Sequence, residues 1–111
     1  MGIVHDAVGA RRRRLILEAP VAGADDAGST AQSFAVIAAV WASLRWTGGD
    51  ERWLADRMEQ AGRYEITLRW RPTVSAGMRF RDGLRLFGVL SAGDPDGGRR
   101  RLVCLCEEIS P

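Results

Sequence analysis

Hydrolytic or transfer chemistry would need a nucleophile beside a base, and the sequence offers His5 as its one histidine. None of the six serines stands at a spacing from His5 that indicates a catalytic pair. Asp25 and Asp26 are adjacent carboxylates, as are Glu107 and Glu108. Adjacent strand residues point apart, and a solvated loop does not raise a carboxyl pKa. Lysine is absent, which excludes a glycine-rich phosphate loop ending in lysine. We therefore expect neither an enzyme nor a cofactor site.

The two cysteines, Cys104 and Cys106, stand two residues apart near the C-terminus. Such positions of a strand share a face, and neighbours of this kind are poorly placed to bond to each other. A Cys-x-Cys pair with one distant histidine falls short of the four ligands that zinc normally takes. We expect both cysteines to be buried, reduced and free of metal, which favours assembly in a reducing cytosol.

Arginine supplies all 16 basic residues, which face 14 acidic ones for a net charge of +2. Guanidinium groups suit phosphates and carboxylates, but arginine beside abundant alanine and glycine is also typical of a GC-rich genome. The near balance of charge leaves little bulk attraction for polyanions, so a nucleic-acid contact would need a local cluster. The run Arg11–Arg14 is one candidate, as a phosphate-binding arm, although we favour its interpretation as a solvated segment that enters the first strand. An outward arginine row is the other candidate: Arg69, Arg71, Arg79, Arg81 and Arg85.

The length of 111 residues supports a single domain, and 46% hydrophobic with 27% charged residues is ordinary for a globular protein. The longest apolar stretch, Phe34 to Leu44, is too short to cross a bilayer, and we expect no signal peptide and no membrane contact. Residues 1–10 are assigned to a flexible N-terminal tail and residues 11–111 to one domain.

Alternating apolar and polar residues predict most of the secondary structure. The clearest run is 64–71, in which Tyr64, Ile66, Leu68 and Trp70 share the inward face. Asp82-Gly83 predicts a hairpin turn, and residues 93–98 predict an exposed loop. Further strands are expected at residues 14–19, 34–46, 78–81, 84–90 and 101–108. The expected core partners of the clearest run are Leu15, Leu17, Met78, Phe80 and Cys104.

Two segments do not alternate. Residues 50–61 carry apolar side chains at helical spacing, with Thr47 or Asp50 as a cap and Gly62 as a stop, so we predict one α-helix there. Residues 21–32 are small and polar and predict a long loop. The fold class is therefore mainly β: a small antiparallel β-barrel or sandwich of about six strands, with one α-helix and a long loop after the first strand.

Several strings, taken in order, resemble the phage head–tail joining proteins, the small neck connector or stopper proteins of long-tailed phages and phage-like gene transfer agents. The ordered set spans about residues 11 to 108 and is more specific than any one string. It comprises Leu17-Glu18-Ala19-Pro20, Val40-Trp41-Ala42, Gly49-Asp50-Glu51, Tyr64-Glu65-Ile66-Thr67-Leu68-Arg69-Trp70-Arg71-Pro72, Met78-Arg79-Phe80-Arg81-Asp82-Gly83 and Leu102-Val103-Cys104-Leu105-Cys106-Glu107-Glu108.

The resemblance implies a structural protein without catalytic residues that forms a homo-oligomeric ring. The ring would sit in the particle neck, after assembly in the bacterial cytoplasm, between the portal-bound adaptor protein and the tail terminator or tail tube protein. Double-stranded DNA would pass through it without sequence specificity. The resemblance fits either an adaptor or a stopper. It also fits either an infectious phage or a gene transfer agent.

The same resemblance assigns candidate contact residues. The loop Val21–Ser33 is the candidate channel or partner contact, through Asp25, Asp26, Gly28, Ser29, Thr30 and Gln32. Candidate ring or partner contacts are Trp46, Glu51, Arg52, Asp56, Arg69, Arg71, Arg79 and Arg81.

A second hypothesis is a small OB-like nucleic-acid-binding domain that uses the outward arginine row. Alternation turns Trp70 and Phe80 away from that row, which weakens the stacking platform that single-strand binders use. The four tryptophans fit core or subunit contacts better than base stacking. We therefore favour the neck protein.

Overall fold

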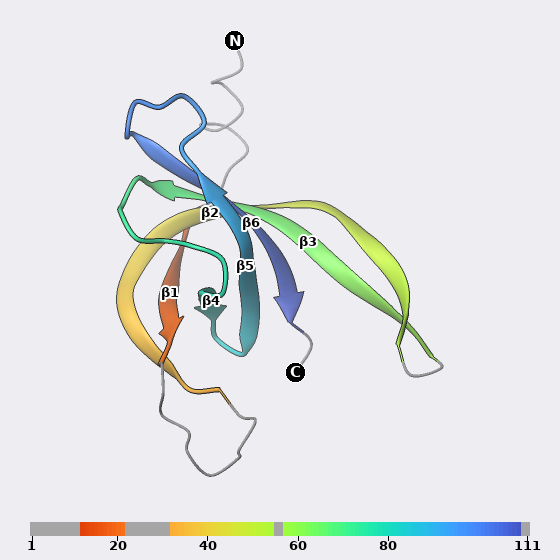
Figure 1. Ribbon diagram of the computed structural model, residues 1–111. Coiled ribbons are helices and arrows are strands. Elements are labelled where there is room, and N and C mark those ends of the chain that lie inside the picture. The colour runs from red at the N-terminus through yellow and green to blue at the C-terminus, as the bar shows by residue number, and fades with distance from the viewer. Residues whose placement is uncertain (1–11, 22–31, 55–56, 110–111) are drawn as a thin grey trace.

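The computed structural model describes residues 12–21, 32–54 and 57–109, with the side chains of all these except residues 49–54 and 57–61. Its six strands form a closed antiparallel barrel in the order β1-β2-β3-β6-β5-β4 (Figure 1). They are β1 (Arg12–Pro20), β2 (Phe34–Leu54), β3 (Arg57–Arg69), β4 (Arg79–Asp82), β5 (Arg85–Gly93) and β6 (Arg101–Ile109).

Period-two alternation places the core as predicted. Ile66 and Leu68 of β3 are buried, and Tyr64 and Trp70 are partly buried against the same cluster. A strand presents alternate side chains to one face, so each strand contributes every second residue to the barrel interior. All five expected core partners are buried: Leu15, Leu17, Met78, Phe80 and Cys104.

The barrel closes between β1 and β4, which are distant in the sequence. Their register pairs Ile16 with Arg81, Leu17 with Phe80, and Glu18 with Arg79. Closure removes the unpaired edges that an open sheet would expose. The short β4 is therefore the last piece of the barrel wall.

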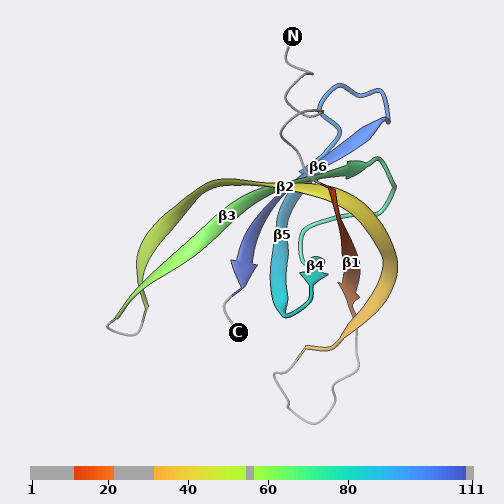
Figure 2. The ribbon, with the colours of Figure 1, turned by 180° about the vertical axis from the view of Figure 1, so that it is seen from behind.

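The predicted helix at residues 50–61 is wrong. β2 and β3 instead stay paired beyond the barrel, through Asp50↔Ala61 to Leu54↔Arg57 (Figures 1 and 2). Pairing that starts in the barrel extends one residue at a time, whereas a helix of about 12 residues must nucleate and is marginal without packing. We call residues 48–54 and 57–63 the β2–β3 arm.

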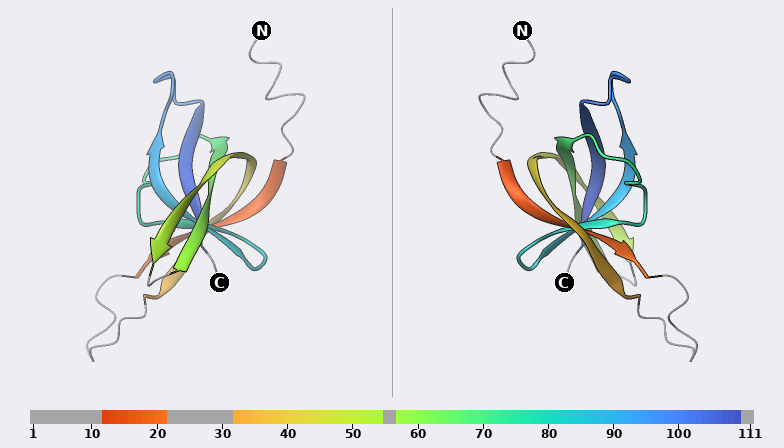
Figure 3. Two further views of the ribbon diagram at one scale, coloured as in Figure 1. Left: turned by 90° about the vertical axis from the view of Figure 1, so that its right-hand side faces the viewer. Right: turned by 90° about the vertical axis from the view of Figure 1, so that its left-hand side faces the viewer.

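A bulge marks the base of the β2–β3 arm. The register shifts between Trp46 and Gly48, and Gly48 has φ of +133°, a conformation that a side chain would disfavour. Bulges bend a strand and increase its twist. The ribbon leaves the barrel at this point and extends to one side of it (Figures 1 and 2), so that the left view of Figure 3 shows the arm in front of the barrel.

The hairpin between β4 and β5 forms one residue later than predicted. Asp82 pairs with Arg85, so Gly83 and Leu84 are the central residues of the turn. Gly83 has φ of +62°, which suits the first central position of a type II′ turn. Asp82 is held in the strand by Arg13, whose Nη1 donates to its Oδ2 at 2.8 Å. Leu84, expected in the strand, is 94% exposed.

The predicted loop after the first strand begins and ends at the barrel. The amide of Val21 donates to the carbonyl oxygen of Ser33 at 2.9 Å, which joins the end of β1 to the residue before β2. Most of the loop, residues 22–31, lies outside the described residues, as does the predicted N-terminal tail at residues 1–10.

Candidate functional site

Glu18 is the one buried charged residue among those described. It lies in the closing seam, the pairing of β1 with β4, and links the two strands. Arg79 Nε donates to Glu18 Oε1 at 2.7 Å, and Arg81 Nε donates to Oε2 at 2.9 Å. Burial alone would raise the pKa of the Glu18 carboxyl, but the two arginine hydrogen bonds outweigh it and hold the pKa below its usual value. Arg79 also stacks on Phe34, with its guanidinium carbon 3.8 Å from the ring centroid.

Arg85 makes a second charge cluster, on the β5 side of the barrel. Its Nε and Nη2 donate to the two carboxylate oxygens of Glu108 at 2.9 and 3.0 Å, and Nη2 also donates to the Tyr64 hydroxyl at 3.1 Å. The hydrogen bond with Glu108 raises the pKa of Arg85, and the same bond lowers the pKa of Glu108. The guanidinium lies 4.9 Å from the Phe87 ring centroid.

The structure does not bring the outward arginine row together. β6 and β5 separate β3 from β4, so Arg69 and Arg71 lie apart from Arg79 and Arg81. Arg79, Arg81 and Arg85 are each paired with a carboxylate. The OB-like hypothesis needed all five arginines on one open face, and that prediction is wrong.

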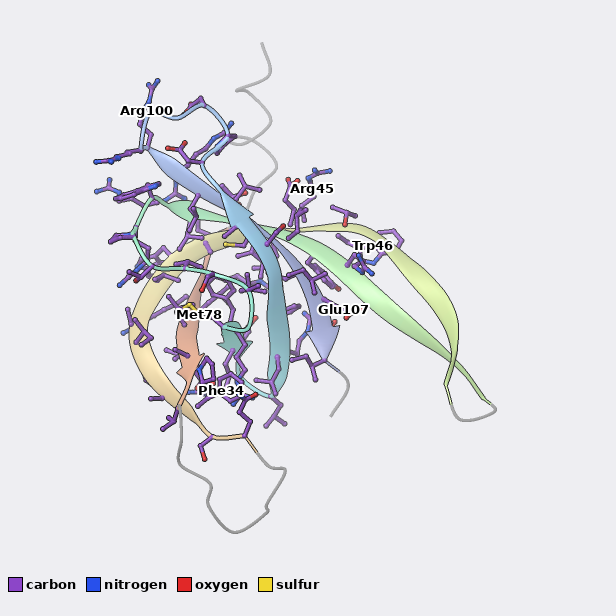
Figure 4. The ribbon with its side chains drawn as sticks, in the orientation of Figure 1. Phe34, Arg45, Trp46, Met78, Arg100 and Glu107 are labelled. Carbon is purple, nitrogen blue, oxygen red and sulfur yellow. The ribbon has the colours of Figure 1, made fainter. Side chains whose placement is uncertain are left out.

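Arg69 and Arg71 instead belong to a basic groove at the end of the barrel where β1 and β6 begin. Two neighbouring hollows of about 360 and 240 Å³ have Arg12, Trp41, Leu68 and Arg69 in common, and we call the two together the basic groove. Its remaining lining residues are Val40, Ser43, Thr67, Trp70, Arg71, Arg100 and Arg101. Arg100 is labelled at this end of the molecule in Figure 4.

Strand register and one loop assemble the basic groove. Antiparallel pairing sets Arg69 of β3 opposite Arg101 of β6. Asp94 stabilises the loop before β6, because its carboxylate accepts hydrogen bonds from the amides of Gly97 and Arg99 at 3.0 and 2.8 Å. Arg99 then lies over Trp70, with 5.3 Å between its guanidinium carbon and the ring centroid.

The sequence carried a signal for this groove that the arginine row obscured. Arg99, Arg100 and Arg101 form a second basic run, immediately before the last predicted strand. Antiparallel pairing of that strand with 64–71 would have placed the run beside Arg69. Which strands pair is the information that periodicity does not contain.

Three of the predicted ring contacts fall on one element. Trp46, at the base of the β2–β3 arm, is 63% exposed, and Glu51 and Arg52 follow it along β2. Asp56 lies outside the described residues. Trp46 appears on the arm side of the barrel in Figure 4.

The predicted loop contacts are less fully placed. Gln32 is exposed just before β2, whereas the other five lie outside the described residues: Asp25, Asp26, Gly28, Ser29 and Thr30. Their roles stay predictions.

Cys104 and Cys106 are free and buried, as expected for small apolar side chains. Burial raises the pKa of the Cys104 thiol to about 12 and raises the pKa of Cys106 further. Within the described residues, no cluster of His, Cys, Asp and Glu side chains could hold a metal ion. That part of the chain also contains no helix long and apolar enough to cross a membrane.

Comparison with known proteins decides the family. The sequence model of the phage head completion protein family matches residues 7–109. The chain belongs to this family. A chain from a structure titled "Virion of native gene transfer agent (GTA) particle" is similar to this head completion protein, with a TM-score of 0.73 and 28% identity. The likeness covers 91% of this chain and 98% of that chain. No curated protein matches the sequence.

Family membership confirms the resemblance found in the sequence. Head completion proteins are structural phage proteins, and the similar chain is part of a gene transfer agent virion. This head completion protein is accordingly a structural protein of a phage-type particle, built as a six-stranded antiparallel barrel.

Proposed function

We propose that this head completion protein forms a ring in the neck of a phage or phage-like gene transfer agent particle. There it joins the DNA-filled head to the tail and helps to retain or pass DNA. The family match over residues 7–109 carries the proposal. The likeness to a virion chain supports it, because the two chains correspond over nearly their whole lengths.

The proposed ring has different neighbours on its two sides. A portal-bound adaptor protein lies on the head side and a tail terminator or tail tube protein on the tail side. Residues 11–111 supply the connector domain, and residues 1–10 lie outside the described residues. Double-stranded DNA passes through the channel without sequence specificity, and the particle assembles in the bacterial cytoplasm.

The loop between β1 and β2 is the proposed channel or partner contact. It carries Asp25 and Asp26 and no basic residue between Val21 and Ser33. A ring of such loops would repeat the carboxylates around the channel and repel DNA phosphates, which keeps the duplex from adhering to the wall. The hydrogen bond from the Val21 amide to the Ser33 carbonyl oxygen joins the two ends of the loop at the barrel. It supports the expectation that the barrel folds without the residues between them.

Deletion of the gene in the particle-producing strain tests the proposal. We expect heads and tails to accumulate separately, counted by electron microscopy, and a plasmid copy to restore joined particles. A matched variant lacks only residues 25–29 and should fold normally but yield particles that lose DNA or fail to join tails. Normal yields of tailed, DNA-filled particles from the gene deletion would contradict the proposed function.

The two variants separate the parts of the proposal. Normal particles from the loop deletion alone would remove the loop from the channel but leave the neck role intact. Immunogold labelling of intact particles gives the position independently, with label expected between head and tail.

A further inference from the structure

The basic groove is rich in hydrogen-bond donors and has no acidic lining. None of the described side chains that line its two hollows is a carboxylate, whereas five are arginines and two carry hydroxyls. They are Arg12, Arg69, Arg71, Arg100, Arg101, Ser43 and Thr67. On the β4 side of the barrel, by contrast, Arg79 and Arg81 lie against the carboxylate of Glu18. The groove therefore concentrates positive charge.

Several of the groove arginines lack a counter-ion within the described part of the chain. Arg12 and Arg69 form no ion pair with any carboxylate there, and the Nε of Arg71 is buried there without a hydrogen-bond partner. Asp96 interacts electrostatically with Arg100, but its Oδ1 already accepts a hydrogen bond from the amide of Gly98 at 3.0 Å. A buried donor without an acceptor is costly, so an anionic ligand in the groove would be favourable.

Strand register arranges the donors in a row across the barrel wall. Arg12 of β1 pairs with Ser43 of β2, and Ser43 pairs with Thr67 of β3. Arg69, two residues further along β3, pairs with Arg101 of β6. Neighbouring strands lie about 4.8 Å apart, so these four strands spread the donors over roughly 14 Å. A row of this length suits a chain of repeated negative charges better than a single anion.

We propose that the basic groove binds the phosphate backbone of double-stranded DNA. Guanidinium groups bind phosphate oxygens bidentately, and serine and threonine hydroxyls also donate to them. Phosphate contacts carry no sequence information, which fits DNA that passes without sequence specificity. This inference rests on the proposed neck function, because DNA is the polyanion that the proposed ring surrounds.

The groove and the acidic loop lie at opposite ends of β1. This strand begins at Arg12, in the groove, and ends at Pro20, where the loop starts. Arg100 and Phe34, which mark the groove and the end of the loop, are labelled at opposite ends of the molecule in Figure 4. In the proposed ring, the groove supplies the contact that retains DNA, and the loop carboxylates keep the rest of the channel from adhering to it.

Binding of a short fluorescent duplex to the purified full-length protein tests the site. Measured by anisotropy, the wild type should bind at micromolar concentration, equally for two unrelated sequences, and weaken steeply with salt. Arg69→Gln/Arg100→Gln should lower the affinity about tenfold or more at low salt. It should also reduce the slope of log affinity against log salt concentration by about two, because two phosphate contacts are lost.

The matched control is Arg45→Gln/Leu84→Glu. It changes the net charge by the same amount at exposed positions that do not line the groove, and should bind DNA like the wild type. Arg69→Lys/Arg100→Lys keeps both charges and should retain the salt slope of the wild type. No binding by the wild type, or an equal loss of affinity in the groove and control variants, would overturn the proposal.

An acidic segment of a neighbouring protein is the competing occupant of the groove. If it bound there, Arg69→Gln/Arg100→Gln would be lost from particles, while its affinity for the duplex would equal that of the control variant. That pair of results would overturn the assignment to DNA. On our proposal the variant enters joined particles, and the fraction of their DNA that nuclease digests rises severalfold.

The gene deletion separates this inference from the proposed function. If the deletion leaves heads and tails apart but the wild-type protein does not bind the duplex, the groove proposal fails and the neck function stands. If the deletion yields normal particles while the groove variant loses DNA affinity, the neck function fails and the DNA site stands.

Discussion

Glu18 is a buried carboxylate that joins β1 to β4 through two arginines. It is 5% exposed and accepts from arginines on the neighbouring strand. Removal of the carboxylate charge by Glu18→Gln leaves Arg79 and Arg81 without their counter-ion. Breaking a buried ion pair from one side costs about 3–5 kcal/mol, and we expect the lower end because both arginines keep some solvent contact. Urea unfolding measures this loss.

The matched control is Glu65→Gln. Glu65 accepts from Arg45 at 2.8 Å, and the Arg45 side chain is 68% exposed. Exposed ion pairs contribute about 0–1 kcal/mol, so this variant should unfold close to wild type. Equal losses from the two substitutions would show that the Glu18 cluster does not stabilise the seam.

Acid should destabilise the protein by protonating the carboxylates of Glu18 and Glu108. The folded-state pKa values of Glu18 and Glu108 lie below the ordinary value of 4.5, so folding holds both groups ionised. Their contribution is complete above the unfolded pKa and is lost as the pH falls below about 4.5 towards the lowered folded values. We expect stability measured by chemical unfolding to decline over this range. Glu18→Gln should decline less steeply, and a decline as steep as that of wild type would contradict the assignment.

The cysteines should be chemically silent in the native protein. Burial raises both thiol pKa values, and the thiolate is the reactive form. At pH 8 we expect a thiol reagent to label neither Cys104 nor Cys106, and to label both in denaturant. Labelling of either cysteine in the folded protein would mean that β6 opens.

At the scale of elements, the spacing of apolar residues predicted the strands within the barrel correctly but predicted a helix where the β2–β3 arm lies. The run 64–71 showed which side chains face inward because one face of β3 meets the core. Over Gly48–Leu54, β2 pairs only with β3 among the described strands, so the barrel interior does not set the period of the apolar residues there. Apolar residues at helical spacing then predicted a helix, while the strand pairing that continues from Trp46 and Tyr64 decided the structure.

The arm should be removable without loss of the barrel. Deletion of residues 51–60 with Ala61→Gly joins Gly49 and Gly62 through an Asp-Gly turn, a sequence that favours two-residue hairpins. The described core residues all lie outside this segment, so we expect thermal melting within a few degrees of wild type. We also expect the variant to be absent from particles. Unfolding of this variant would show that the arm belongs to the folding unit.

At the scale of the whole molecule, the candidate sites were the least predictable part. The sequence marked Arg79 and Arg81 as outward and available, and they are indeed on the outside of β4. Only the closing of the barrel sets them beside Glu18, which is about 60 residues earlier. Likewise, Arg12, Arg69 and Arg100 line one hollow because β1 begins, β3 ends and β6 begins at the same end of the barrel. Side-chain periodicity shows the face of a residue but not its neighbours across strands.

The shared interior makes one core substitution a test of the entire arrangement. Leu68 of β3 is 4% exposed and pairs in register with Ala42 of β2 and Leu102 of β6. Leu68→Ala opens a cavity between three strands, and such cavities cost about 2–5 kcal/mol. We expect the melting temperature to fall by roughly 10 °C or more. Leu84→Ala, at a side chain that is 94% exposed, removes the same atoms without a cavity and should melt within about 1–2 °C of wild type. Because both variants lose identical groups, equal melting would mean that the faces of β3 are reversed and that the barrel interior is not where the structure places it.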